Sequence, residues 1–191
     1  MKVIGFTGNY GKEDSVPQAY LMADSSILYT GRAFFVPDFA RQFVATPSIV
    51  VRMGRLGKCV APKFAHRYWD AFTAAFTVRA CGSDDERLEG LDRAFDGAAI
   101  VGDWIPVSDA GEAMNAQVEL KVGDKVEAQC CLADMQCPLE ELIAAASTRC
   151  SIKMGDLLFT GDAGEGHALT PGEHLTACIG GQQVLDVKVK L

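Results

Sequence analysis

The sequence predicts a mixed, β-rich α+β fold, because many short strand-like segments accompany only a few helical ones. The strand-like segments are runs of aliphatic and aromatic residues that end at Gly, Pro or charged turns. They do not alternate regularly with helices, as the strands of a parallel α/β protein would. The 191 residues contain no linker, repeat or low-complexity tract, so we expect one domain over residues 1–191.

In the first half of the chain, the expected strands are residues 1–6, 33–37, 49–53 and 72–80. Pro47 and the turn at 54–57 are expected to bound the third of these. Residues 62–70 are expected to be helical, because Pro62 suits a first helical turn. Ser83 and Glu86 form a capping-box pattern that predicts a helix from Ser83 to about Leu91.

The second half of the chain predicts two hairpins and one clear helix. The hairpins are expected over residues 117–131, turning at Gly123-Asp124, and near the C-terminus, turning at Gly180-Gly181. Residues 138–147 are expected to form the helix, and residues 157–159 a strand. These elements complete the β-rich pattern.

Composition indicates a globular protein of the cytoplasm. Hydrophobic residues make up 49% and charged residues 23% of the chain. No apolar run approaches the roughly 20 residues that cross a bilayer, so we expect no membrane span. The first residues lack the long apolar core of a secretory signal, so we expect a cytoplasmic protein.

Charge argues against a nucleic-acid partner, because a net charge of −7 repels phosphate unless a basic face is segregated. Two short basic clusters are present and are interpreted as solvated faces: Arg52, Arg55 and Lys58, and then Lys63, His66 and Arg67.

The seven cysteines show no C-x-x-C pair and no histidines at zinc-finger spacing. We interpret them as reduced thiols that mostly serve as small, buried apolar side chains.

The stretch LLFTGDAGEGH, residues 157–167, is the strongest candidate for a functional loop. It lacks the lysine of a P-loop and the alternating acids of an EF-hand. Asp162, Glu165 and His167 are of metal-ligand type, but polar residues in a glycine-rich loop are more often simply solvated.

Residues 154–161, MGDLLFTG, resemble a conserved glycine loop of the fumarylacetoacetate hydrolase family. Other segments resemble that family in the same order along nearly the whole chain: VIGFTGNY at 3–10, DSSIL at 24–28, RMGRLGK at 52–58, RAFD at 93–96, EELI at 140–143 and the closing residues 172–191. The resemblance implies a β-rich fold around a highly twisted mixed sheet, usually in a homodimer.

The resemblance also implies a chemistry: cleavage, decarboxylation or isomerisation at carbon–carbon bonds of 2-oxo acids such as acylpyruvates. In the family, three carboxylates hold Mg²⁺ or Mn²⁺, which binds the oxygens of the substrate. Such a cation stabilises the enolate that forms when the carbon–carbon bond breaks.

This chain departs from the family at the positions that carry that chemistry. The three metal-ligand positions fall at Thr46, Ser48 and Thr77. One family lysine becomes Met22 and another becomes Arg93, which cannot release a proton as a base. Asp162 replaces a threonine of the glycine loop. We therefore expect no metal cofactor and a loss of the family reaction.

The old substrate cleft remains a candidate site for a small ligand, either in a homodimer or in a chain paired with an active relative. Its candidate residues are Met22, Asp24, Arg93, Thr160, Gly161, Asp162 and Glu165. Asp162 and Glu165 favour a cationic or neutral ligand, unless Arg93 or Lys12 offsets them.

The alternative is an active 2-oxo-acid hydrolase or isomerase that uses displaced metal ligands. These would be drawn from Asp14, Asp24, Asp162, Glu165 and His167. Asp24 also has a simpler interpretation, because an aspartate before Ser25-Ser26 suits the cap of a turn.

Overall fold

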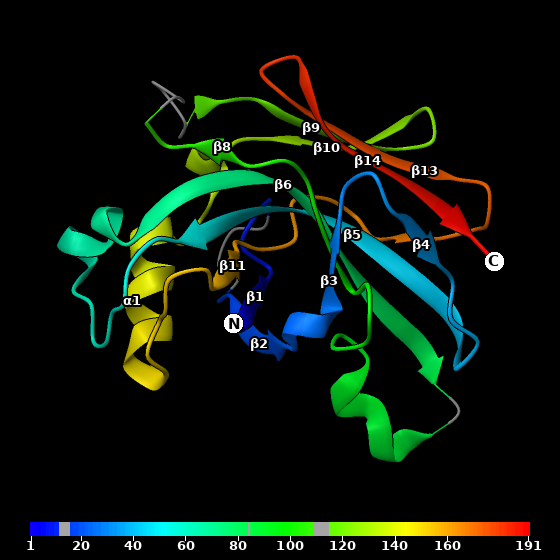
Figure 1. Cartoon of the computed structure of the whole chain (residues 1–191), viewed down its shortest axis with the longest axis horizontal. Coiled ribbons are helices and arrows are strands. Elements are labelled where there is room, and N and C mark those ends of the chain that lie inside the picture. The colour runs from blue at the N-terminus through cyan, green and yellow to red at the C-terminus, as the bar shows by residue number, and fades with distance from the viewer. Residues whose placement is uncertain (12–15, 84, 109–114) are drawn as a thin grey trace.

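The computed structural model describes residues 1–11, 16–83, 85–108 and 115–191. Over these residues the chain forms a nine-stranded and a five-stranded sheet, which confirms the expected β-rich α+β fold with few helices. Both sheets mix parallel and antiparallel pairs. Figure 1 shows the five-stranded sheet above the long pair formed by residues 40–53 and 69–83, with the strands at residues 3–7, 18–22 and 27–29 below that pair.

The nine-stranded sheet has the order β2-β1-β11-β5-β6-β7-β3, and two short strands, β12 and β8, pair with β5 and β6. Its strands are β1 Val3–Thr7, β2 Gln18–Met22, β3 Ile27–Tyr29, β5 Ala40–Met53, β6 Trp69–Ser83, β7 Ala99–Val101, β8 Ile105–Pro106, β11 Leu157–Phe159 and β12 His167–Ala168. The five-stranded sheet has the order β10-β9-β13-β14-β4. Its strands are β4 Ala33–Phe35, β9 Val118–Val122, β10 Lys125–Cys130, β13 His174–Ile179 and β14 Gln182–Lys190. The two expected hairpins are β9–β10 and β13–β14.

The pair β5–β6 forms the centre of the larger sheet and is longer than the sequence pattern predicts. β5 has 14 residues and includes Pro47, which was expected to bound the strand. That expectation is wrong. The Pro47 carbonyl accepts a hydrogen bond from Ala163 N at 2.8 Å, and the ring nitrogen faces the same side of the strand, towards the glycine loop. The missing N–H of proline therefore removes no hydrogen bond between β5 and β6.

Helical segments are few and short. The one α-helix, α1, spans Leu139–Arg149 among the described residues and follows Pro138, as expected. The remaining helical segments are 3-10 helices: η1 Asp24–Ser26, η2 Pro62–Arg67, η3 Glu86–Leu91 and η5 Leu132–Asp134.

Two helix boundaries differ from the expectation. The helix expected over residues 62–70 ends at Arg67, since Trp69 already begins β6. The helix expected from Ser83 begins at Glu86, because Ser83 pairs with Ala40 in the sheet. Asp85 provides the cap instead, and its side chain accepts a hydrogen bond from Arg87 N at 3.1 Å.

The main core lies between the two sheets, where Ile49, Phe72 and Phe76 of the larger sheet belong to one cluster with Leu120 and Leu175 of the smaller. A second apolar cluster covers the opposite face of the larger sheet and includes Val3, Met22, Val50, Ala75 and Phe159. The candidate site lies on this second face, because its residues alternate with those of the main core along the same strands.

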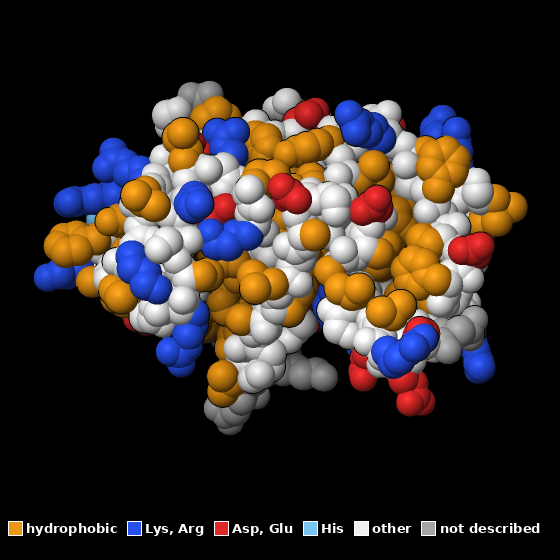
Figure 2. Space-filling view, turned by 60° about the horizontal axis from the view of Figure 1, so that its bottom comes forward, with side chains coloured by type: hydrophobic (Ala, Val, Ile, Leu, Met, Phe, Trp, Pro, Cys, Tyr) orange, Lys and Arg blue, Asp and Glu red, His pale blue; other side chains and the backbone are white. Residues whose placement is uncertain are grey.

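Basic side chains are concentrated at one end of the molecule. Figure 2 shows Lys and Arg side chains gathered at the left end of the molecule, the end at which η2 lies in Figure 1. Among the described residues, no helix is long and apolar enough to cross a bilayer.

Candidate functional site

Thr46, Ser48 and Thr77 lie together on one face of β5 and β6. Thr46 pairs directly with Thr77, and Ser48 is two residues further along β5. Side chains two apart on a strand share a face, so the three hydroxyls project to the same side of the sheet. Strand register thus brings together residues that are distant in the chain.

These hydroxyl groups are buried or half-buried, and one of them already has a partner. Ser48 Oγ donates a hydrogen bond to the carbonyl oxygen of Gly161 at 2.7 Å. Thr77 Oγ1 is buried without a hydrogen bond of standard geometry among the described residues. Thr46 is half-buried.

This donor set does not match three carboxylates. Hydroxyl oxygens are neutral, whereas the hard cations Mg²⁺ and Ca²⁺ are bound in proteins mainly through carboxylates, carbonyls and water. Among the described residues, no group of three or more His, Cys, Asp or Glu side chains is arranged to hold a metal ion. Thr46, Ser48 and Thr77 therefore do not fit the ligand set that the resemblance implies.

Tyr20 covers part of the same face. β2 pairs with β1 so that Tyr20 stands opposite Gly5. A Cβ atom on Gly5 would lie 2.2 Å from Tyr20 Cζ, so the ring fits here only because position 5 has no side chain. The Arg93 guanidinium packs on this ring, with Cζ 4.8 Å from its centroid.

Asp162 completes a polar cluster with Tyr20 and Arg93. Burial raises the pKa of Tyr20, and the charge of Asp162 adds to this rise. Arg93 and the Thr77 hydroxyl act in the opposite direction but do not cancel it. Burial likewise raises the pKa of Asp162, against the opposing effects of Arg93, the Gly8 backbone N–H and Arg79. Two arginines thus face one carboxylate, which changes the expectation that Asp162 makes this cleft acidic.

The glycine loop is held in place by the N-terminal segment. Asn9 Nδ2 donates to the carbonyl oxygens of Thr160 at 2.8 Å and Cys137 at 3.1 Å, and Asn9 Oδ1 accepts from Cys137 N at 2.8 Å. Thr160 Oγ1 donates to Ile49 O at 2.9 Å and lies 2.8 Å from the Tyr10 hydroxyl. Gly161 has φ of 140°, and a Cβ there would lie 2.5 Å from Asn9 Cβ. Only glycine suits this position.

Other expected cleft residues lie elsewhere or serve packing. Met22 is buried in the second apolar cluster. The Asp24 side chain is 61% exposed and lies 3.9 Å from the N-terminal amino group. Glu165 is exposed, so it does not add negative charge to the cluster of Asp162. Lys12 and Asp14 lie outside the described residues.

His167 is engaged away from Asp162 and Glu165. Its Nε2 lies 2.9 Å from Glu173 Oε1, and its Nδ1 lies 3.4 Å from Glu127 Oε1. The displaced ligands that the structure describes, Asp24, Asp162, Glu165 and His167, are therefore not gathered at one point.

Sequence reasoning missed Tyr20, Arg79, Glu127 and Glu173. Tyr20 shares a face of β2 with Met22, but no strand was expected at residues 18–22, so the sequence reasoning did not connect the two. Glu127 meets His167 only through the packing of the glycine loop on β10, for which the sequence carries no local signal. Glu173 is only six residues from His167 along the chain.

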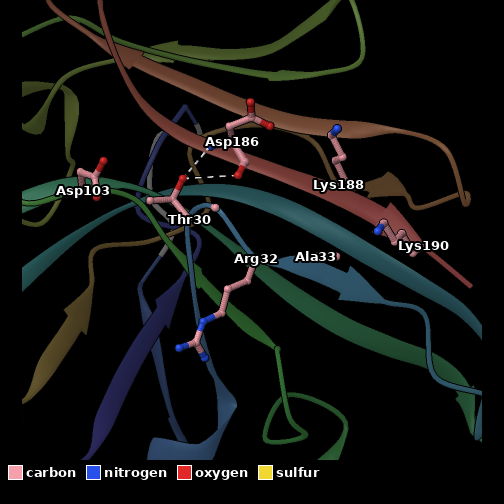
Figure 3. A pocket seen from close by; sticks show the side chains of 8 residues that line it. Thr30, Arg32, Ala33, Asp103, Asp186, Lys188 and Lys190 are labelled. Carbon is pink, nitrogen blue, oxygen red and sulfur yellow. Dashed lines mark hydrogen bonds between the residues drawn. The ribbon is translucent and has the colours of Figure 1, made fainter.

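A separate pocket of about 550 Å³ opens beside β4 and β14 (Figure 3). In Figure 3 the Arg32 side chain extends away from Lys188 and Lys190, so these cations do not converge on one point. None of the expected site residues lines this pocket, whose lining is Thr30, Gly31, Arg32, Ala33, Asp103, Asp186, Lys188 and Lys190.

The fold is similar to those of several solved enzymes. Fumarylpyruvate hydrolase from Pseudomonas aeruginosa, in complex with Mn²⁺ and pyruvate, matches with a TM-score of 0.87 and 19% identity, over 100% of this chain and 90% of that chain. 5-carboxymethyl-2-hydroxymuconate delta-isomerase from Mycobacterium smegmatis matches at 0.86 and 20% identity, over 99% and 78%. 2-hydroxyhepta-2,4-diene-1,7-dioate isomerase from Mycobacterium marinum matches at 0.86 and 21% identity, over 99% and 74%. No curated protein matches the sequence.

One of these structures corrects the expectation that no metal cofactor is involved. The Pseudomonas aeruginosa relative binds Mn²⁺ on the same fold, which contradicts that expectation. Thr46, Ser48 and Thr77 offer hydroxyl oxygens as donors, and this donor set does not by itself exclude a metal cofactor.

The sequence match to a family model extends over nearly all of the chain. The model described as fumarylacetoacetate (FAA) hydrolase C-terminal matches residues 7–190. The chain therefore belongs to the fumarylacetoacetate hydrolase family.

Proposed function

We propose that this chain binds a small carboxylate in the family's cleft and has lost the carbon–carbon bond chemistry of its relatives. The observation that carries the proposal is that Thr46, Ser48 and Thr77 share one face, at positions where the family resemblance leads us to expect carboxylates. Breaking a carbon–carbon bond next to an oxo group leaves an enolate, which needs strong positive charge held at a fixed point. Neutral hydroxyls would hold a dication much less firmly than three carboxylates do.

Arg93 supports a binding role. Its guanidinium carries a permanent charge and two parallel donors, which match the geometry of a carboxylate. It packs on the Tyr20 ring and offsets the charge of Asp162, so an anion is not repelled by an unopposed carboxylate.

Two buried hydroxyls add capacity for a polar ligand. Tyr20 Oη and Thr77 Oγ1 have no hydrogen bond of standard geometry among the described residues. The Thr77 hydroxyl and Arg93 already lie near enough to Tyr20 to lower its pKa, so a ligand oxygen would join these polar groups or replace one of their contacts. Assembly as a homodimer, or with an active relative, remains a prediction from the family resemblance.

Thermal unfolding with added oxalate tests this proposal. Oxalate at a hundredfold excess over its dissociation constant should stabilise the native state by about 2.7 kcal/mol, a rise in Tm of several degrees. Arg93→Gln should remove the rise, whereas Arg32→Gln, which changes an exposed arginine of the other pocket, should keep it. An equal rise in wild type and Arg93→Gln would contradict the binding role.

The loss of chemistry needs a separate assay. Wild-type protein supplied with Mn²⁺ and an acylpyruvate should leave the ultraviolet absorbance of the substrate unchanged, compared with an active family member assayed in parallel. Mn²⁺-dependent turnover by the wild type would overturn the loss of activity while leaving the oxalate result to stand on its own.

A further inference from the structure

Basic residues are concentrated in one stretch of an acidic protein. None of the 25 Asp and Glu residues falls within positions 39–69, which hold six of the 18 Lys and Arg residues. Four of these cations, Arg55, Lys58, Lys63 and Arg67, are exposed on η2 and on the segment before it. We call this surface the basic end, and Figure 2 shows its cations at the left of the molecule.

The basic end has an exposed apolar centre. Phe64 is 42% exposed and Leu56 is 72% exposed. Lys63 Nζ lies 4.9 Å and Arg67 Cζ 5.1 Å from the centroid of the Phe64 ring, so cations flank the aromatic side chain. A single pocket is lined by Arg55 and Leu56 together with Phe64 and Arg67. Arg55 of the first basic cluster and Arg67 of the second thus lie at one surface.

A surface of opposite character surrounds η3. Its centre is an apolar pocket of about 330 Å³ whose lining includes Phe39, Leu88, Leu91 and Phe95. Leu88 and Leu91 are 49% and 57% exposed. Acidic side chains outnumber basic ones around this pocket: Asp85 and Asp92 are in the lining, and Glu86 and Glu89 are exposed on η3. Arg87 on the same element is paired with Asp85 at 2.7 Å, which leaves three unopposed carboxylates there. In Figure 2 this surface, which we call the acidic end, lies at the lower right.

The two ends are complementary in both charge and apolar content. An exposed aromatic ring flanked by cations is the kind of side chain that anchors in an apolar pocket with an acidic rim. Opposite charges around such a contact favour the correct pairing, and like charges oppose basic-to-basic or acidic-to-acidic pairing.

We propose that the basic end of one copy of this chain docks onto the acidic end of a second copy, with Phe64 entering the pocket beside η3. The two surfaces are different, so each copy uses one to receive a neighbour and the other to bind the next. Such contacts build a closed ring or an open row. The patches are small and charged, so the association is weak and is reversed by salt.

Sedimentation velocity of the purified full chain tests this docking. The average mass of the wild type should rise with protein concentration at about 0.05 M NaCl and fall back at about 0.5 M, because salt screens the opposed charges. Phe64→Ser should weaken the association about tenfold, the loss expected for one aromatic anchor. A dimer formed through any other surface would set a baseline mass that all variants share.

Two charge-reversed variants make the test specific. Lys63→Glu/Arg67→Glu cancels the positive charge of the basic end, where Arg55 and Lys58 remain, and Glu86→Lys/Glu89→Lys removes the negative charge of the acidic end. Each variant alone should stay at the baseline mass, whereas an equal mixture of the two should associate, since the intact acidic end of the first variant meets the intact basic end of the second. Lys188→Glu/Lys190→Glu, which changes exposed cations on β14, should behave as wild type.

The proposal fails if the wild-type mass does not depend on concentration and salt. It also fails if the mixture of reversed variants stays at the baseline mass while both variants unfold at the wild-type temperature. If a reversed variant does not fold, Phe64→Ser decides the question, because its failure to weaken the wild-type association would exclude the docking.

Discussion

Tyr20 depends on three neighbours of different chemistry: the bare backbone of Gly5, the guanidinium of Arg93 and the hydroxyl of Thr77. Each of these residues comes from a different strand or connection, so a shift of any of these segments would move the Tyr20 ring. The tightest of these contacts is the one with Gly5.

Gly5→Ala should disturb the cleft through this contact. The added Cβ would overlap the Tyr20 ring at 2.2 Å, which forces the ring or β1 to move. We expect a loss of about 1–3 kcal/mol in unfolding free energy, measured by urea titration. Gly90→Ala is the matched control, because nothing lies within 4 Å of a Cβ there.

The pair Gly5→Ala/Tyr20→Ala distinguishes steric overlap from a general loss of strand stability. If overlap with the ring is the cause, adding Gly5→Ala to the Tyr20→Ala background should cost much less than adding it to the wild type. Equal costs in both backgrounds would contradict the steric explanation.

At the scale of elements, β12 links the two sheets through its first residue. β12 pairs with β5 of the larger sheet, while His167 contacts Glu127 on β10 of the smaller one. Glu173, just before β13, contacts the other ring nitrogen of His167 and also accepts a hydrogen bond from Thr170 N at 2.8 Å. The end of the glycine loop is therefore connected to the second sheet by polar contacts.

These contacts predict a pH dependence of stability. Burial acts to raise the pKa of Glu173, but the Thr170 N–H and His167 outweigh it, so the net pKa is lowered. A carboxyl group whose folded pKa is lowered stabilises the protein above its unfolded pKa of about 4.3 and loses that contribution as pH falls through the folded value. Wild type should therefore exceed Glu173→Gln in unfolding free energy by about 1 kcal/mol at pH 6, with the difference shrinking below about pH 4.

Urea titrations from acid to neutral pH check this dependence. Glu165→Gln serves as the control, because Glu165 is exposed in the same loop region, and it should leave the pH profile unchanged. A constant difference between wild type and Glu173→Gln at all pH values would show that ionisation of Glu173 contributes nothing.

At the scale of the whole molecule, the seven free cysteines sample environments from surface to core. Cys59 is exposed, Cys130 is buried, and the other five are half-buried. Burial, with smaller effects from Asp134 and Cys131, raises the pKa of Cys130 to about 12. Because the thiolate is the reactive form, these thiols should differ widely in rate.

Labelling with a thiol reagent at neutral pH should therefore give one fast phase from Cys59, while Cys130 reacts only as the whole fold opens. Cys59→Ser should remove the fast phase, and added urea should accelerate the slowest one. A fast phase that persists in Cys59→Ser would show that a second thiol is freely accessible.

Local pattern was sufficient for elements whose signals lie within a few residues. The hairpins β9–β10 and β13–β14 and the helix α1 were predicted from alternation, glycine turns and proline position. Local pattern failed where a residue contacts a segment that is distant in the sequence. Pro47 was read as a boundary because proline lacks a donor, yet that side of β5 faces the glycine loop and not β6.

The sequence by itself determined the β-rich fold class and the family. Only the tertiary structure decided that Arg93 packs on Tyr20, that His167 contacts Glu127 and Glu173, and that Arg55 and Arg67 line one pocket. The physical reason is the distance along the chain over which each kind of interaction acts. Side-chain alternation and turn chemistry act over a few residues, whereas these contacts join segments whose meeting depends on the register of β5 with β6 and on the packing of one sheet on the other.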